Sequence, residues 1–310
     1  MNKQLLFFIG MLLGFVFLAQ DQSGLHAQQD PQYTQYMYNL SVLNPAYAGS
    51  KETMNVGLLH RNQWTGFDGA PKTSSLFFHT PWGEKTGIGV SAIIDEIGPV
   101  EETNIFADYS YTISIADGHK LAFGLKAGAT LHQVGLIDLD LITSGDQAFS
   151  SNSSETFLNF GTGVFYYTDN YYLSLSIPNI LKGEHLDANG VMYGNEKSHF
   201  FIAGGYVYDL NNNVKIKPSF FVKTAFDAPI SYDVNLNAKF YNHFELGASY
   251  RLDDSFSGLI NVDVTPWMQV GFAYDSVVSE INTVAPTSYE AFIIFDIFPQ
   301  PKALRSPRFF

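Results

Sequence analysis

Cysteine is absent from this 310-residue chain, and positively charged residues are few. Without cysteine there can be no disulfide, no thiolate metal site and no lipidated N-terminal cysteine, so any attachment to a membrane must come from the fold itself. The 17 Lys and Arg residues against 30 Asp and Glu give a formal net charge of -13. A chain this acidic repels phosphate backbones, which argues against a nucleic-acid partner.

Long apolar runs are also scarce. Lys3 followed by the apolar stretch 5–18 is typical of a secretory signal peptide, which we assign to residues 1–27 with cleavage after Ala27. Cleavage after Ala19 is the alternative. Beyond Ala27 no uninterrupted run reaches the ~18 apolar residues of a membrane-spanning helix. If the mature chain lies in a membrane, we expect it to cross as strands.

Alternation of apolar and polar residues is the strongest pattern that the chain does contain. In the stretch 119–131, Phe123 and Leu125 fall on one face of a strand. Gly124 and Lys126 fall on the opposite face, because successive side chains of a strand point to opposite sides. Several later stretches repeat this split, which predicts an all-β protein. The chain also holds 18 Tyr and 27 Phe, many of them near predicted strand ends, where a barrel carries its aromatic girdles.

The lengths of the connections choose between a soluble sandwich and a membrane barrel. We predict about 14 strands, at 53–61, 73–80, 86–95, 102–115, 119–132, 156–167, 170–177, 198–209, 213–224, 230–240, 242–250, 256–264, 267–275 and 287–298. Every second connection is a tight turn, whereas intervening ones such as 133–155 are long. A soluble sandwich also alternates but has no reason to keep this parity. Short turns on the periplasmic side and long loops outside are typical of outer-membrane barrels.

We therefore predict a transmembrane antiparallel β-barrel in residues 51–300, followed by a short tail at 301–310. The protein is expected to be integral to a bacterial outer membrane and its lipid bilayer, with both termini periplasmic.

Motifs that would indicate an enzyme are missing. The sequence has no Gly-x-Ser-x-Gly elbow, no His-Glu-x-x-His and no Walker-type lysine, so we expect no catalytic residues and no cofactor. Asp138, Asp140 and Asp146 have a spacing that could hold calcium, but a solvated acidic loop is the favoured interpretation.

Charged residues within strands suggest a network in the barrel lumen. Lys215, Lys217 and Lys223 share one parity on a predicted strand. Asp233 and Lys239 on the next strand could meet them, and such a network would fill or narrow the interior.

The segment 28–50 differs from the rest, because it is rich in Gln, Tyr, Asn and Pro and lacks helix or strand periodicity. Tyr33, Tyr36, Tyr38 and Tyr47 combine large contact area with a hydroxyl group, which suits a packed plug or a partner-binding arm better than an inert linker.

This segment also carries a family resemblance. QDPQYTQYMYNLSVLNPAYAGS at 29–50 resembles the N-terminal signature of the PorP/SprF family of type IX secretion system membrane proteins from Bacteroidetes. Later stretches resemble the family in the same order: HRNQWTGFDGAPKT at 60–73, GIGVS at 87–91, KLAFGLKAG at 120–128, IPNI at 177–180, IKPSFFVKT at 216–224 and SPRFF at 306–310.

The resemblance implies an outer-membrane barrel that works with the type IX secretion machinery. It implies export or surface anchoring of a specific large surface protein, such as a gliding-motility adhesin, through that protein's C-terminal domain. We expect the loop 62–72, with exposed Trp64 and Phe67, to bind this partner; a self-packed lid is the alternative. A channel for small hydrophobic molecules and a structural scaffold of the secretion apparatus are the other functions considered.

Overall fold

The computed structural model describes residues 31–51, 53–135, 137, 152–181, 184–188, 191–195, 198–225 and 230–297. The predicted signal peptide, the tail at 301–310 and the three aspartates considered for calcium lie outside these residues. Within the described part of the chain, no helix is long and apolar enough to cross a membrane.

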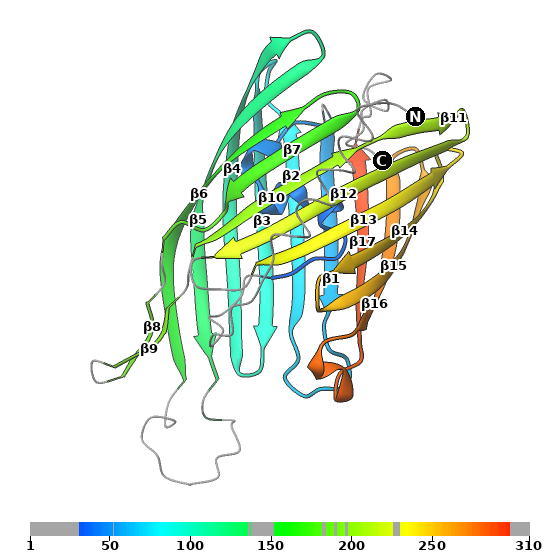
Figure 1. Cartoon of the computed structure of the whole chain (residues 1–310). Helices are drawn as coiled ribbons and strands as arrows, with labels where there is room; N and C mark the ends of the chain where they lie inside the picture. The colour runs from blue at the N-terminus through cyan, green and yellow to red at the C-terminus, as the bar shows by residue number, and fades with distance from the viewer. Residues whose placement is uncertain are drawn as a thin grey trace.

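A ring of antiparallel strands forms the body of the protein (Figure 1). Its members are β1 (Met54–Asn62), β2 (Lys72–Pro81), β3 (Thr86–Ile97), β4 (Val100–Ala116), β5 (His119–Val134), β6 (Ser153–Tyr167), β7 (Tyr171–Ile177), β10 (His199–Tyr206), β11 (Tyr208–Asn211), β12 (Val214–Ala225), β13 (Ser231–Phe240), β14 (Phe244–Arg251), β15 (Ser255–Thr265), β16 (Met268–Val277) and β17 (Thr287–Ile297). Pairing of β17 with β1 closes the ring. β10 and β11 follow one another along the same side of β12 and count as one strand position. The ring therefore has 14 strand positions, which confirms the predicted number.

Burial along the strands is that of a membrane barrel. On β5, Gly124 and Lys126 are buried, whereas Phe123 and Leu125 are 47% and 64% exposed. The small and polar face therefore points into the barrel and the apolar face points outward. Such an outward apolar surface suits the hydrocarbon of a bilayer, so the alternation read from the sequence is confirmed with the orientation that a lipid-facing barrel requires.

Long and short connections lie at opposite ends of the barrel. The loop between β1 and β2, the β5–β6 connection and the β7–β10 connection share one end, which we call the long-loop end. Tight turns after β4, β6, β13 and β15 lie at the other, the short-turn end. The β7–β10 connection contains a hairpin that the sequence analysis missed, formed by β8 (Glu184–Ala188) and β9 (Val191–Asn195), which pair with each other in a separate sheet.

The segment before β1 lies inside the ring as a plug (Figure 1). We use "plug" for residues 31–50, which form η1 (Tyr36–Tyr38), α2 (Leu40–Leu43) and η2 (Pro45–Tyr47). Its apolar side chains are the centre of the buried cluster, and inward side chains of the wall such as Leu59, Phe165 and Phe292 pack around them. Of the two alternatives drawn from the sequence, the ordered plug is the one that the structure contains.

Candidate functional site

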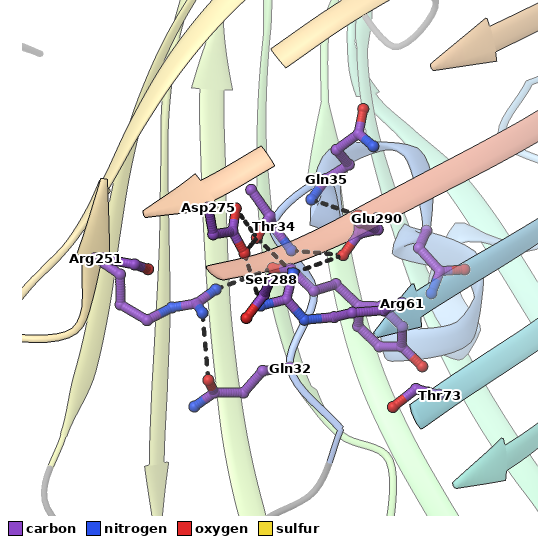
Figure 2. A network of polar contacts seen from close by, with 12 residues as sticks. Gln32, Thr34, Gln35, Arg61, Thr73, Arg251, Asp275, Ser288 and Glu290 are labelled. Carbon is purple, nitrogen blue, oxygen red and sulfur yellow. Dashed lines mark hydrogen bonds and ion pairs between the residues drawn. The ribbon is translucent and has the colours of Figure 1, made fainter. Parts of the chain in front are cut away.

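The start of the plug is fixed to the wall by a buried polar cluster, which we call the latch (Figure 2). The Glu290 carboxylate on β17 accepts hydrogen bonds from the backbone N–H groups of Thr34 at 2.9 Å and Gln35 at 2.8 Å. The Thr34 hydroxyl lies 2.9 Å from Asp275 on β16. Arg61 on β1 donates to the Thr34 hydroxyl at 2.8 Å and pairs with both acids, at 2.8 Å to Asp275 and 3.3 Å to Glu290.

The charged side chains of the latch are almost fully removed from water, and this burial determines their effect on stability. The side chains of Arg61, Asp275 and Glu290 are at most 2% exposed. Charges removed from water in this way are tolerated only when they are paired and hydrogen-bonded, and loss of one partner then costs about 3–5 kcal/mol. The two acids exceed the one arginine, and the two backbone N–H groups of the plug help to compensate the excess negative charge. Docking of the plug therefore supplies N–H donors to the buried carboxylates of the wall.

A second anchor lies beside the latch, on β14. Arg251 forms a bidentate pair with Asp233 on β13, with both nitrogen–oxygen distances at 2.8 Å. Its guanidinium also donates to the Gln32 side chain and to the Tyr33 backbone carbonyl, each at 3.3 Å. Fork-shaped pairing of this kind fixes the guanidinium plane, so Arg251 presents a rigid donor to the chain entering the plug.

Tyr36 is fully buried inside the barrel. Its hydroxyl donates to Ser219 on β12 and accepts from the Asn235 amide on β13, both at 3.1 Å. Its ring stacks on Phe221 with centroids 4.8 Å apart. A buried tyrosine whose ring and hydroxyl are both matched holds one orientation, so Tyr36 sets the register of the plug against β12 and β13.

Tyr38 makes a comparable set of contacts with β12, β14 and β17. Its hydroxyl donates to Glu245 on β14 at 2.5 Å, and its ring stacks on Phe292 at 4.7 Å. The Lys217 ammonium lies 5.1 Å from the centre of the same ring, within range of a cation–π contact. Burial raises the pKa of the Tyr36 and Tyr38 phenols, and the Glu245 carboxylate raises that of Tyr38 further. Both phenols therefore stay protonated and able to donate.

The second half of the plug rests on glycines of the wall. A Cβ atom on Gly87 of β3, Gly124 of β5 or Gly163 of β6 would overlap Ala48, Ala46 or Asn44, respectively. Only a residue without a side chain permits this approach, and we call these three positions the glycine cradle. The close packing that glycines within strands permit thus holds one particular segment of the chain.

Polar groups of the same part of the wall form hydrogen bonds with the plug where it crosses the glycine cradle. The Asn44 amide donates to Ser174 at 2.7 Å and to the Val164 carbonyl at 3.0 Å. Within the plug, the Asn44 side chain accepts from the Ala46 N–H at 2.9 Å and so caps η2. Ser110 donates to the Ala48 carbonyl at 2.6 Å. Since buried backbone groups need partners, these contacts allow an irregular segment to remain inside the barrel.

The four tyrosines considered for partner binding all lie in the plug. Tyr33, Tyr36 and Tyr47 are at most 4% exposed, and Tyr38 is half-buried. Tyr47 packs edge-on against His79 and Phe165. With the plug seated, these rings are occupied by the wall. Binding of a partner through them stays a prediction and would require the plug to leave.

The residues predicted to form a charge network in the lumen differ in burial. Lys217, Lys223, Asp233 and Lys239 are buried, and Lys215 is partly exposed near the short-turn end, 3.8 Å from Asp209. The ion pair described for Asp233 runs to Arg251, and that for Lys239 runs to Asp263 at 2.7 Å. Pairing of the β12 lysines with Asp233 and Lys239 stays a prediction. The antiparallel register sets Asp233 opposite Arg251 on one side and opposite Phe221 on the other.

The loop between β1 and β2 is an ordered lid at the long-loop end. The backbone N–H of Thr65 donates to the Thr287 carbonyl at 2.8 Å, and that of Gly98 donates to the Gly69 carbonyl at 2.9 Å. Phe67 is 51% exposed, as expected, but Trp64 is half-buried, so the prediction that Trp64 is exposed is wrong. Its backbone N–H bonds to Ser288, which draws this part of the loop against β17.

A cavity of about 420 Å³ opens beside the lid. Its lining combines backbone of the lid with polar side chains, namely Asn62, Thr65, Gly66, Phe67, Asp68, Gly69, Ala70, Lys72, Glu96, Gly98 and Tyr289. Trp64 adopts a left-handed backbone conformation with a φ of 48°. That conformation is rare for a bulky residue and is found where the surrounding structure imposes it, often near functional sites. Among the described residues, no group of three or more His, Asp or Glu side chains could hold a metal ion.

The charged residues of the latch were not singled out from the sequence. Arg61, Asp275 and Glu290 stand within strands, at positions whose side chains point inward. A charge inside a predicted strand, on the inward parity, is the pattern that could have marked them. The parity does not say which of these charges meet, because that depends on closure of β17 on β1.

A closed ring with an apolar outer belt, a polar lumen and a plug defines an integral outer-membrane β-barrel. A sequence model described as "Type IX secretion system membrane protein PorP/SprF" matches residues 25–295. The chain belongs to this family, which associates it with the type IX secretion system and confirms the resemblance read from the sequence. No curated protein matches the chain.

Several solved barrels are similar in shape. Outer membrane protein Omp33 of Acinetobacter baumannii is 9% identical with a TM-score of 0.48, over 79% of this chain and 98% of that one. The CymD monoaromatic hydrocarbon channel is 13% identical with a TM-score of 0.49, over 88% and 95%. The P. putida toluene transporter TodX is 10% identical with a TM-score of 0.44, over 81% and 92%. At these identities the likeness is one of architecture alone.

Proposed function

We propose that this barrel binds a specific large exported surface protein, through that protein's C-terminal domain, and aids its export or surface anchoring. In this proposal the long-loop end faces the cell exterior and both chain termini are periplasmic, in keeping with the usual arrangement of outer-membrane barrels. The secretion machinery is the second partner. The work is binding rather than catalysis.

The observation that carries this proposal is the ordered lid. Its backbone is held by hydrogen bonds to β17 and to the β3–β4 turn, so little freedom is lost when a partner binds. Exposed Phe67 beside a polar cavity offers an apolar contact rimmed by hydrogen-bonding groups, which is the usual composition of a protein-binding site. Asp68 and Glu96 outnumber Lys72 among the charged residues of the lining, which favours a partner surface that is neutral or basic.

The plug supports a docking role over a channel for small hydrophobic molecules. Hydrophobic and polar contacts hold it across the lumen, from the latch on β1, β16 and β17 to the cradle on β3, β5 and β6. A ring of 14 positions is also narrow for a folded substrate. We therefore place the exported protein at the long-loop end of the barrel, outside the lumen.

Deletion of the gene tests the proposal. We expect one large surface protein to accumulate in the periplasm and to return to the surface when the wild-type gene is supplied. Complementation with Phe67→Ser is expected to restore surface display only in part, whereas Tyr241→Asn is expected to restore it fully. Tyr241 is a matched control because it is 73% exposed but lies at the short-turn end. An unchanged surface proteome in the deletion strain would reject the proposal, and would favour a scaffold if the machinery still co-purifies with the barrel.

A further inference from the structure

One strand of the wall extends well beyond its neighbour. β6 begins at Ser153, and its pairing with β5 runs the whole way from Ser153 to Tyr167. Its pairing with β7 covers only 162–167. Over 153–161, β6 thus has β5 on one side, and among the described residues no strand pairs with it on the other.

Backbone direction shows which groups face this open side. The Thr168 N–H, just after β6, donates to the Tyr171 carbonyl on the β7 side, and the Phe160 carbonyl accepts from the Ile180 N–H. The backbone N–H and C=O groups of the even-numbered β6 residues therefore point away from β5. Since the direction alternates along a strand, the N–H and C=O groups of Ser154, Thr156 and Leu158 face the open side as well.

Among the described residues, the chain after β7 closes only the first part of this edge. The Asn159 side chain accepts from the N–H groups of Phe160 at 2.8 Å and Leu181 at 3.2 Å. Beyond this cap, Ser154, Thr156 and Leu158 are all exposed, and Leu158 is 65% exposed. The described strands β8 and β9 pair with each other. An edge of this length that no described residue caps is the kind that natural proteins usually cover.

We propose that this free edge of β6, residues 153–158, receives an extended strand of the exported surface protein by β-augmentation. The inference rests on the proposed function and names the backbone site through which it acts. Unpaired N–H and C=O groups along a strand edge are matched by another extended backbone, whereas lipid chains carry no such groups. The edge lies at the long-loop end, the same end as the lid.

The side chains of the edge define the occupant further. Leu158 and Phe160 lie on the outward face, so the added strand would carry apolar residues beside them. Ser154 and Thr156 lie further along the same face and favour polar residues. A second copy of this chain is a poorer occupant, because a net charge of -13 on each copy opposes self-association.

Proline at the edge tests the proposal. Thr156→Pro removes an N–H that faces the open side, so every hydrogen bond to β5 is kept, and proline is tolerated on strand edges. Thr156→Ala changes the same side chain and keeps the N–H. The probe is the purified C-terminal domain of the surface protein that becomes stranded in the deletion strain. We expect Thr156→Pro to weaken its binding to the full barrel about tenfold or more and Thr156→Ala to leave it nearly unchanged.

Ser154→Pro serves as a second variant if Thr156→Pro does not give a heat-modifiable, folded barrel. Amide exchange adds a readout that is independent of substitution: the bound domain is expected to slow exchange at Ser154, Thr156 and Leu158. Exchange at Phe157, whose N–H points to β5, is the internal control.

The outcomes separate the two proposals. Equal binding by the wild type and both proline variants, with unchanged exchange at the edge, would overturn edge docking and leave the proposed function standing. No binding to the wild-type barrel would overturn both. A dimer of the barrel that Thr156→Pro dissociates would assign the edge to a second copy instead.

Discussion

The Arg61 guanidinium lies 2.8 Å from the Asp275 carboxylate, although the strands that carry these residues are separated by β17. Arg61 stands directly opposite Glu290 in the β1–β17 pairing. The latch therefore bridges the seam at which the first and last strands of the barrel meet, and the plug binds on that seam. Stability of the closed ring and retention of the plug are coupled through the same three charges.

Replacement of Arg61 by Met is expected to destabilise the folded barrel by about 3 kcal/mol or more, because Asp275 and Glu290 would stay buried without this counter-charge. The free energy of unfolding is measured by urea titration of the protein in lipid vesicles. The control is Lys215→Gln, which removes an ion pair whose side chains are 33% and 67% exposed and is expected to cost less than about 1 kcal/mol. Equal effects of the two substitutions would show that the latch is not the closing element.

Substitution Gly124→Ala is expected to expel the second half of the plug, since the new Cβ would overlap the backbone of Ala46. Because the chain lacks cysteine, Ser41→Cys, buried at 5% exposure in the plug, is a single labelling site. A membrane-impermeant thiol reagent is expected to label it rapidly in the Gly124→Ala protein and slowly in the parent. Gly258→Ala, where a Cβ meets no atom within 4 Å, is the matched control. Slow labelling in both glycine variants would contradict the cradle.

Removal of residues 31–50 is expected to open the lumen. In planar bilayers the intact protein should give little steady current, and the deletion variant should conduct, because the side chains that fill the centre of the ring are gone. Steady conductance by the intact barrel without any partner would instead favour the channel.

The Tyr36 hydroxyl provides a measure of plug stability without a change in packing. Tyr36→Phe keeps the stack on Phe221 but leaves Ser219 and Asn235 without this partner, so we expect a loss of about 1–3 kcal/mol in unfolding free energy. A double-mutant cycle with Ser219→Ala is expected to show coupling between the two sites. Strictly additive effects would place the hydroxyl outside the network.

Strand positions and ring closure could be predicted from the sequence because they follow from local alternation and loop length. The predicted strand 198–209 is divided in the structure into β10 and β11 at Val207, whose N–H donates to the Asn170 carbonyl at 2.7 Å in line with the β10–β7 register. The β8–β9 hairpin was missed although Asn189-Gly190, a strong hairpin turn dipeptide, lies between its strands.

The contacts of the candidate site could not be predicted in the same way. Alternation places Asp233 and Lys239 inside the barrel but does not identify their partners, because those come from strand register and from reach across a neighbouring strand. The helical turns of the plug span only three or four residues, too few for a periodic pattern. Their conformation is imposed by the wall, through contacts between residues up to 256 positions apart.

The seam position of the latch sets an order on biogenesis. The plug is made and exported first, yet its acceptor Glu290 is on β17, the last strand of the barrel. A barrel intermediate that still lacks β17 has no complete binding site for the segment at its own N-terminus. Docking of the first half of the plug at the latch therefore requires β17 to be in place.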